Sequence, residues 1–347
     1  MAKKTGKNKA EKLDYAALRR ELKADGPGRL YLLYGREDYL REDFLRGLRA
    51  LCLPEGDDGF AYHRFDAAQP DLRALAEAVN SLPFTTERTL VEVRGFDLNR
   101  CRDAEASELE RIVSDIPDYC TLVFVLSSDY EPDMRLKAAK LLCRLGRAVD
   151  FTPQGQDQLM NWIRKRFAAL DKDVGPEACA ALIMTSGELM NGLIPEIAKI
   201  AAGTPGREVT AEDVERLASP IPEAQVFKLA DCLADGDYDG AARQLHELLS
   251  AGEEPIMALA VIGMQMRRLY TARAAIEDGL GREFVEKNCG VRYSFALDKL
   301  MNTARRLDIG YLASAVELCA EADYAMKSSP VDDGELLREL LIRLAVS

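Results

Sequence analysis

The chain has 347 residues, 48% of them hydrophobic and 30% charged, with a formal net charge of −12 at pH 7. This composition is typical of an ordinary soluble protein of two or three domains, and no run approaches the ~20 apolar residues that a membrane-spanning helix needs. The acidic balance disfavours a protein that grips nucleic acid alone, so we expect any DNA contact to be local or shared with partners.

The N-terminal residues 1–12 are basic but lack the apolar segment of a signal peptide, so we expect a solvated tail on a cytoplasmic protein. The eight cysteines form no Cys-x-x-Cys pair, and His63 and His246 are the only histidines. The sequence therefore predicts reduced thiols and no metal site. It also lacks the HExxH, GxSxG and GxGxxG motifs, which predicts neither a catalytic site nor a bound cofactor.

Residues 1–151 alternate between short apolar segments and segments with apolar side chains at helical spacing. The apolar segments are typical of buried strands and lie at 29–35, 61–65, 89–93, 121–127 and 148–151. The segments between them predict helices at 38–52, 71–79, 105–116 and 135–146. Strands separated by helices in this way predict a parallel sheet that is covered by helices on both faces.

A phosphate-binding loop would follow the first predicted strand, where Gly35 stands. The GxxxxGK[ST] pattern needs a second glycine for close backbone approach, a lysine for the phosphates and a hydroxyl for magnesium. Counted from Gly35, these positions hold Leu40, Arg41 and Glu42. The third predicted strand runs into Arg94 rather than into an acidic pair that would orient magnesium. The sequence thus predicts a nucleotide-type fold without its nucleotide chemistry.

The stretch Ser81-Leu82-Pro83-Phe84 lies between the helix predicted at 71–79 and the strand predicted at 89–93. Two large apolar side chains in a loop allow two interpretations. Leu82 and Phe84 either cap the core of their own domain or bind a partner, and periodicity alone favours the first. Pro83 restricts the loop and so lowers the entropy cost of ordering it on binding.

Residues 152–219 predict a small helical domain. Helical patterns lie at 157–170, 176–187, 193–203 and 209–218, the last opened by a capping box of Thr210 and Asp213. The proline-containing segment 219–224 is a predicted linker. Beyond it, residues 220–347 contain six helical segments of unequal length and no fixed repeat, which predicts a compact helical domain.

Six segments in a fixed order match a known family. They are LYLLYGREDYLRED (30–43), SLPFTTERTLVEV (81–93), TLVFVLSSDYEPDMRLKAAKLL (121–142), the helical stretch 226–273, NCGVRYSFALDKLMNTARRL (288–307) and EADYAMKSS (321–329). With them the chain resembles the delta subunit of the bacterial DNA polymerase III clamp loader. The resemblance extends over nearly the whole chain and is looser at 188–203. It implies an AAA+-like α/β domain at 1–151 without a working P-loop, a helical lid domain at 152–219 and a helical collar domain at 220–347.

The resemblance also implies a function. Such a subunit is non-catalytic, and it binds the sliding clamp, the beta subunit, and opens it for loading onto primed DNA. Its other partners are the gamma/tau ATPase subunits and delta prime, and it works in the cytoplasm at replication forks. Residues Ser81, Leu82, Pro83 and Phe84 look like the clamp-binding element.

Three residues of the C-terminal region are weaker candidates for contact with DNA. By resemblance, Tyr324 stands where an aromatic ring can meet DNA and stack on a base. Arg267 and Arg268 lie on a long predicted helix, where they form a solvated face or contact a neighbouring subunit or a phosphate. Two alternatives to the clamp-loader function stay open: a divergent AAA+ ATPase, and a helical scaffold or regulator with an α/β head.

Overall fold

The computed structural model describes residues 15–53, 60–84 and 86–346, which form two compact units. The first unit extends to Pro153 and includes Leu189–Asn191, and the second contains the remaining residues. The predicted division of the second unit at residue 219 stays a prediction, because the contacts separate two units only. The predicted tail at residues 1–12 lies outside the described residues.

The first unit is built on a five-stranded sheet in the order β2-β3-β4-β1-β5, in which every paired strand is parallel. The strands are β1 (Leu30–Tyr34), β2 (Tyr62–Asp66), β3 (Thr89–Arg94), β4 (Cys120–Val125) and β5 (Arg147–Asp150). The central strand β4 is buried along its whole length, which explains its continuous apolar sequence. All five predicted strands are therefore confirmed, each to within two residues.

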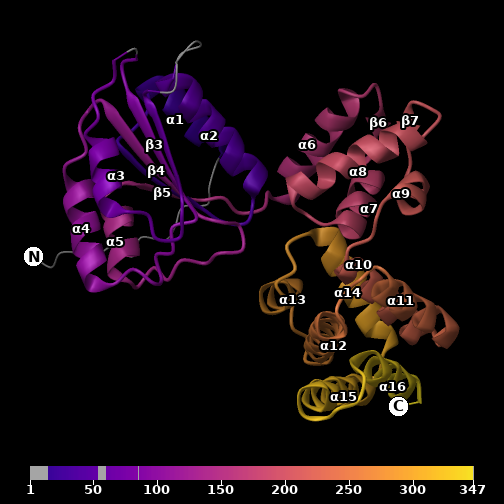
Figure 1. The fold of residues 1–347 in the computed structure, drawn as a ribbon. Helices are drawn as coiled ribbons and strands as arrows, with labels where there is room; N and C mark the ends of the chain where they lie inside the picture. Colours follow the sequence, from indigo (N-terminus) through magenta and orange to yellow (C-terminus); the bar gives the residue numbers. More distant parts are fainter. Residues whose placement is uncertain (1–14, 54–59, 85, 347) are drawn as a thin grey trace, which may run out of the picture. The chain divides into compact units, whose positions relative to one another are not determined.

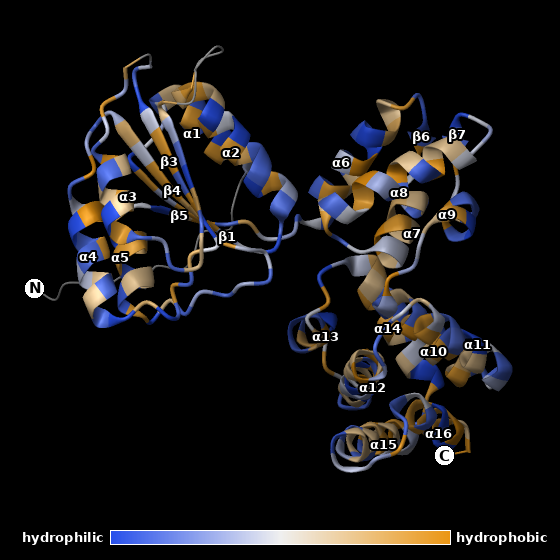
Figure 2. Ribbon diagram, in the orientation of Figure 1, coloured by the Kyte–Doolittle hydropathy of each residue, from blue (hydrophilic) through white to orange (hydrophobic). Residues whose placement is uncertain are grey.

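Helices cover both faces of this sheet (Figure 1). They are α1 (Tyr15–Asp25), α2 (Asp38–Cys52), α3 (Leu72–Val79), α4 (Asp103–Ser114) and α5 (Lys137–Leu145). In the view of Figure 1, α1 and α2 lie on one side of the strands and α3, α4 and α5 on the other. Hydrophobic residues follow the strands (Figure 2), and Phe44 of α2 packs its ring against Tyr31 and Phe151.

Helix α1 was not predicted from the sequence. Only Leu18 and Leu22 of this helix are buried, so its apolar pattern is short. Contacts with distant residues hold it instead: the Tyr15 hydroxyl donates to Asp43, and Glu21 forms an ion pair with Arg147 at 2.8 Å. Two apolar positions are too few to predict a helix from the sequence when its stability comes from tertiary contacts.

The second unit is almost entirely helical. Its helices are α6 (Gln156–Ala168), α7 (Pro176–Ser186), α8 (Met190–Gly203), α9 (Ala211–Leu217), α10 (Pro222–Asp235), α11 (Tyr238–Ser250), α12 (Pro255–Glu277), α13 (Arg282–Cys289), α14 (Ser294–Arg306), α15 (Ile309–Ser328) and α16 (Asp333–Val346). The short helix α13 and the two-residue parallel pair β6 (Asp173–Val174) and β7 (Glu208–Val209) were not predicted. The capping box is confirmed, since Asp213 N donates to Thr210 Oγ1 at 3.2 Å and Thr210 N to Asp213 Oδ2 at 3.1 Å.

Helix α12 is the centre of the C-terminal helices and packs against α10, α13, α14, α15 and α16. Their shared apolar core begins at Val226 and ends at Leu344. In the described part of the chain, no helix combines the length and apolar character needed to cross a membrane. The predicted class, a parallel α/β domain followed by a helical region, is confirmed.

Candidate functional site

The loop formed by residues 80–88 connects α3 to β3 at the edge of the sheet where the parallel strands begin. Its two large apolar side chains point away from the core: Leu82 is 61% exposed and Phe84 is 85% exposed. Ser81 and Pro83 are half-buried. The interpretation that Leu82 and Phe84 cap the core of their own domain is therefore wrong.

Three hydrogen bonds join the start of this loop (Asn80 and Ser81), Thr89 of β3 and Tyr119 to one another. Thr89 Oγ1 donates to the carbonyl of Ser81 at 3.1 Å, which ties the two ends of the loop together. The hydroxyl of Tyr119 donates to the carbonyl of Asn80 at 3.3 Å, and Thr89 N donates to the carbonyl of Tyr119 at 2.7 Å. The segment before β4 thus supports the segment before β3.

The second stem is fixed through Arg88. Thr86 Oγ1 donates to the carbonyl of Arg88 at 2.7 Å, and Arg88 Nη1 donates to Thr121 Oγ1 at 3.1 Å. Thr121 in turn donates to the carbonyl of Gly28 at 2.9 Å. With both stems held by hydrogen bonds and the two apolar side chains exposed, the loop presents Leu82 and Phe84 with part of the ordering cost of binding already met.

At the opposite edge of the sheet, Gly35 serves backbone packing. Its φ of +104° lies in the region that favours glycine, and a Cβ there would lie 2.7 Å from the backbone nitrogen and oxygen of Phe151. Glu37 N donates to the carbonyl of Phe151 at 2.8 Å, and Phe151 N donates to that of Tyr34 at 2.7 Å. The turn after β1 therefore packs against Phe151, which follows β5. This close backbone contact accounts for the glycine, and no bound phosphate is needed to explain it.

The side chains at the three positions that test the P-loop pattern all make contacts within the protein. Leu40 is buried in the core, and the Arg41 guanidinium forms an ion pair with Asp38 and donates to the carbonyl of Gly35 at 2.7 Å. Burial lowers the pKa of Arg41, with Asp38 opposing the shift. Glu42 accepts two hydrogen bonds from Arg94 at 2.9 and 3.0 Å.

A cavity of about 640 Å³ lies beside these residues, at the ends of β3 and β4. Its charged lining residues are Asp38, Arg41, Glu42, Arg64, Asp66 and Arg94. Each arginine is neutralised within the set, because Arg41 pairs with Asp38, Arg64 with Asp66 and Arg94 with Glu42. The cavity therefore offers no excess positive charge to a polyphosphate.

Beneath α2, the carboxylate of Glu92 is fully buried in the middle of β3. It accepts hydrogen bonds from Arg49 Nη2 at 2.6 Å and from the Tyr62 hydroxyl at 2.9 Å, and it pairs with Arg94. Burial raises the pKa of Glu92, but these hydrogen bonds outweigh it and hold the pKa below its usual value. This buried network links α2 to β2 and β3 and so has a structural role.

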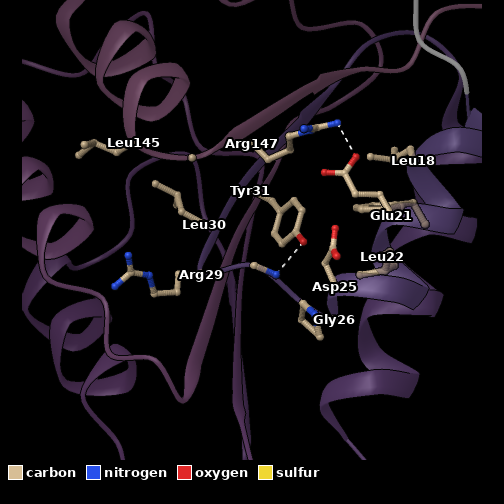
Figure 3. A pocket seen from close by; sticks show the side chains of 14 residues that line it. Leu18, Glu21, Leu22, Asp25, Gly26, Arg29, Leu30, Tyr31, Leu145 and Arg147 are labelled. Atoms are coloured by element: carbon tan, nitrogen blue, oxygen red, sulfur yellow. Dashed lines mark hydrogen bonds and ion pairs between the residues drawn. The ribbon is translucent and has the colours of Figure 1, made fainter.

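A second cavity, of about 330 Å³, lies between α1 and the starts of β1 and β5 (Figure 3). The Tyr31 hydroxyl accepts a hydrogen bond from Gly28 N at 2.8 Å, and Glu21 and Arg147 pair across the cavity at 2.8 Å. Its lining includes no histidine, cysteine, serine or threonine. Its polar side chains are Glu21, Asp25, Arg29, Tyr31 and Arg147, of which Glu21 and Arg147 are paired with each other.

The candidate DNA-contacting residues lie on two helices that pack together. Arg267 is exposed and Arg268 half-buried on α12, and Tyr324 is 72% exposed on α15. Lys327, one turn after Tyr324, pairs with Asp323 at 2.7 Å. Lys327 and Asp323 therefore form an exposed ion pair beside the Tyr324 ring.

Metal and thiol chemistry receive no support from the described residues, which contain no group of three or more His, Cys, Asp or Glu side chains placed to hold a metal ion. The buried thiols, such as Cys120, are core residues. Burial raises the pKa of Cys120 to about 12, which suppresses the reactive thiolate.

Sequence reasoning missed the residues that hold the loop. Tyr119 and Thr121 stand more than thirty residues after the loop, and no local pattern links them to Asn80 or Arg88. It also passed over Phe60, an exposed aromatic residue just before β2. Phe60 carries the same signal as Phe84, a large apolar side chain in a segment that leads into a strand.

Comparisons with known proteins agree over most of the chain. The family model "DNA polymerase III, delta subunit" matches residues 31–152, and "DNA polymerase III delta subunit, C-terminal domain" matches residues 223–344. "DNA polymerase III subunit delta" of Bacillus subtilis (strain 168) is 26% identical over 323 residues, which is 91% of this chain and 92% of the relative. "Probable DNA polymerase III subunit delta" of Aquifex aeolicus (strain VF5) is 20% identical over 318 residues, 90% of each chain.

A solved structure described as "Bacillus subtilis DNA clamp loader delta protein" shares the fold. It has a TM-score of 0.56 and 24% identity, and the alignment covers 96% of this chain and 100% of that one. The two family models lie on the α/β domain and on the C-terminal helices respectively. The order of the matched parts and their extent agree with the resemblance seen in the sequence. This chain belongs to the DNA polymerase III delta subunit family.

Proposed function

We propose that this chain binds the sliding clamp through the tip of the 80–88 loop and opens it for loading onto primed DNA. The exposure of Leu82 and Phe84 on a loop whose stems are hydrogen-bonded is the observation that carries this proposal. Full burial of such side chains is worth roughly 1.5–3 kcal/mol each, so the pair in one pocket makes a binding hot spot.

The chain does this without hydrolysing ATP. The paired charges of Arg41, Glu42 and Arg94 occupy the positions that would contact phosphate and magnesium. ATP hydrolysis is instead the work of the gamma/tau subunits, with which this chain assembles together with delta prime in the cytoplasm at replication forks. Residues 220–347, which contain α10–α16, form the collar through which the subunits meet, and Tyr324, Arg267 and Arg268 are the candidates for contact with primed DNA.

The test is a binding measurement between the purified chain and the cognate clamp. We expect saturable 1:1 binding without nucleotide, and its loss when Leu82 and Phe84 are replaced by serine. A chain that shows no affinity for the clamp would instead favour a scaffold or regulator with an α/β head. ATP turnover by the isolated chain would favour a divergent ATPase.

A further inference from the structure

The exposed apolar side chains of the α/β domain gather at one edge of its sheet. Among the described residues of this domain, the large apolar side chains with substantial exposure are Leu51, Phe60, Leu82, Phe84 and Leu145. Each lies at the end of a helix or in a segment that leads into the next strand. In a parallel sheet these positions lie at the end where the strands begin, and none of the five lies at the opposite end.

Phe60 lies directly beside the 80–88 loop. Tyr62 of β2 is in register with Leu90 of β3, and Leu90 N donates to the carbonyl of Ala61 at 2.8 Å. Phe60 directly precedes Ala61, so it lies close to the segment that enters β3 at Leu90. Phe60 is 67% exposed, so its ring adds apolar surface next to the stem of the loop.

Leu51 approaches the same stem from the face of the sheet. The next residue, Cys52, is buried, which raises the pKa of its thiol, and Thr121, the residue to which Arg88 donates, opposes that shift. The last turn of α2 therefore lies over the base of the loop. Leu51, in that turn, is 48% exposed. Leu51 and Phe60 thus flank the stem on the β2 side.

The width of a standard protein interface shows whether Leu51, Phe60 and Phe84 can be covered by one partner. A standard interface covers about 800 Å² on each partner, which is roughly 30 Å across. Phe84 is four residues from Arg88 and hence at most about 14 Å from it. A globular partner that covers Phe84 and the loop stem would also cover Phe60 and Leu51.

We propose that Leu51 and Phe60 form a second apolar contact with the sliding clamp, beside the Leu82–Phe84 tip. This inference rests on the proposed function, and it adds an apolar patch on the clamp next to the pocket that receives the tip. The tip supplies most of the binding energy, and the Leu51–Phe60 contact fixes the orientation of the clamp and slows its release.

The test compares variants of the full chain for affinity to the purified clamp. Leu51→Ala with Phe60→Ala is expected to weaken binding roughly tenfold, mainly through faster dissociation, without change in melting temperature. Leu170→Ala with Phe284→Ala is the matched control, since both residues are exposed but lie in the second unit, and it should bind as the parent does. A photoreactive p-benzoyl-phenylalanine in place of Phe60 should crosslink to the clamp.

Two results overturn different statements. If Leu82→Ser with Phe84→Ser abolishes binding while Leu51→Ala with Phe60→Ala binds as the parent does and position 60 gives no crosslink, the second contact does not exist and the proposed function stands. If Leu82→Ser with Phe84→Ser keeps the parent's affinity, the proposed function itself is wrong.

Discussion

The guanidinium of Arg94 donates two parallel hydrogen bonds to the carboxylate of Glu42, at 2.9 and 3.0 Å. Glu42 stands where a P-loop carries its magnesium-binding hydroxyl, and Arg94 follows the strand that would end in an acidic residue. Burial lowers the pKa of Arg94, but Glu42 and Glu92 outweigh it and raise the pKa above its usual value. The paired charges of Glu42 and Arg94 therefore occupy the positions that a magnesium–nucleotide complex would contact.

We expect no ATP binding by the isolated chain. A triphosphate would have to displace Glu42 from Arg94 and Asp38 from Arg41, and each displaced carboxylate would then repel it. Titration with fluorescent ATP and magnesium should show no saturable binding at micromolar concentrations, with an active clamp-loader ATPase subunit as the positive control. Micromolar affinity that depends on magnesium would contradict this.

The Glu92 network predicts a pH-dependent loss of stability. Glu92→Gln leaves Arg49 and Arg94 without their buried countercharge, so we expect a cost of about 2–4 kcal/mol at pH 7. Because the folded-state pKa of Glu92 is lowered, its contribution is complete above the unfolded value near 4.5 and disappears as the pH falls through the folded value. Urea unfolding should therefore show the gap between parent and variant shrinking as the pH is lowered from about 5 to 3.

The control for this experiment is Glu110→Gln, which removes a partly exposed ion pair with Arg144. Its cost should stay below about 1 kcal/mol at pH 7. Equal costs for the two variants, or a gap for Glu92→Gln that does not change with pH, would show that Glu92 is not the ionised centre of the network.

The sequence predicts the centre of the sheet well because β1, β3 and β4 are buried almost throughout and have short apolar sequences. The departure from the P-loop pattern is also visible in the sequence, since Leu40, Arg41 and Glu42 stand at fixed distances from Gly35. Pairings such as Glu42 with Arg94 could not, because they depend on the strand order, which hydrophobic periodicity does not encode.

The exposure of Leu82 and Phe84 shows a different limit. An apolar residue near the end of a helix has the same pattern whether it faces the core or the solvent, so periodicity favoured the wrong alternative. Only the positions of the stems decide between them, and these depend on hydrogen bonds from Thr89, Tyr119 and Arg88. The role of the two exposed side chains in clamp binding stays a prediction from the family resemblance.

The loop stem should contribute to clamp binding by limiting the loop's freedom. Tyr119→Phe removes the hydrogen bond to the Asn80 carbonyl, and a typical net loss of about 0.5–1.5 kcal/mol corresponds to roughly 2- to 10-fold in affinity. Hydrogen exchange in residues 80–88 should rise, and clamp affinity should fall. Tyr130→Phe is the matched control, because the Tyr130 hydroxyl binds Asp97 at 2.9 Å outside this loop. Faster hydrogen exchange in the loop with unchanged clamp affinity would show that the order of the loop does not contribute to clamp binding.

Tyr324 should affect the binding of primed DNA only in the assembled complex. Stacking on one base is worth about 1–3 kcal/mol, so Tyr324→Ala should weaken DNA binding roughly tenfold while Tyr324→Phe retains it. Since Lys327 is paired with Asp323, neither variant should alter the salt dependence of binding. Unchanged DNA affinity for Tyr324→Ala would assign this ring to packing between subunits.

Replacement of both tip residues separates binding from folding. Leu82→Ser with Phe84→Ser removes two side chains worth together about 3–6 kcal/mol when buried, so clamp affinity should fall at least 100-fold. The melting temperature should stay nearly constant, because both side chains are mostly exposed in the free chain. Leu170→Ser with Phe284→Ser changes the same residue types at exposed positions of the second unit and should leave clamp affinity intact. Clamp affinity equal to that of the parent in the Leu82→Ser, Phe84→Ser variant would mean that the clamp binds elsewhere on the chain.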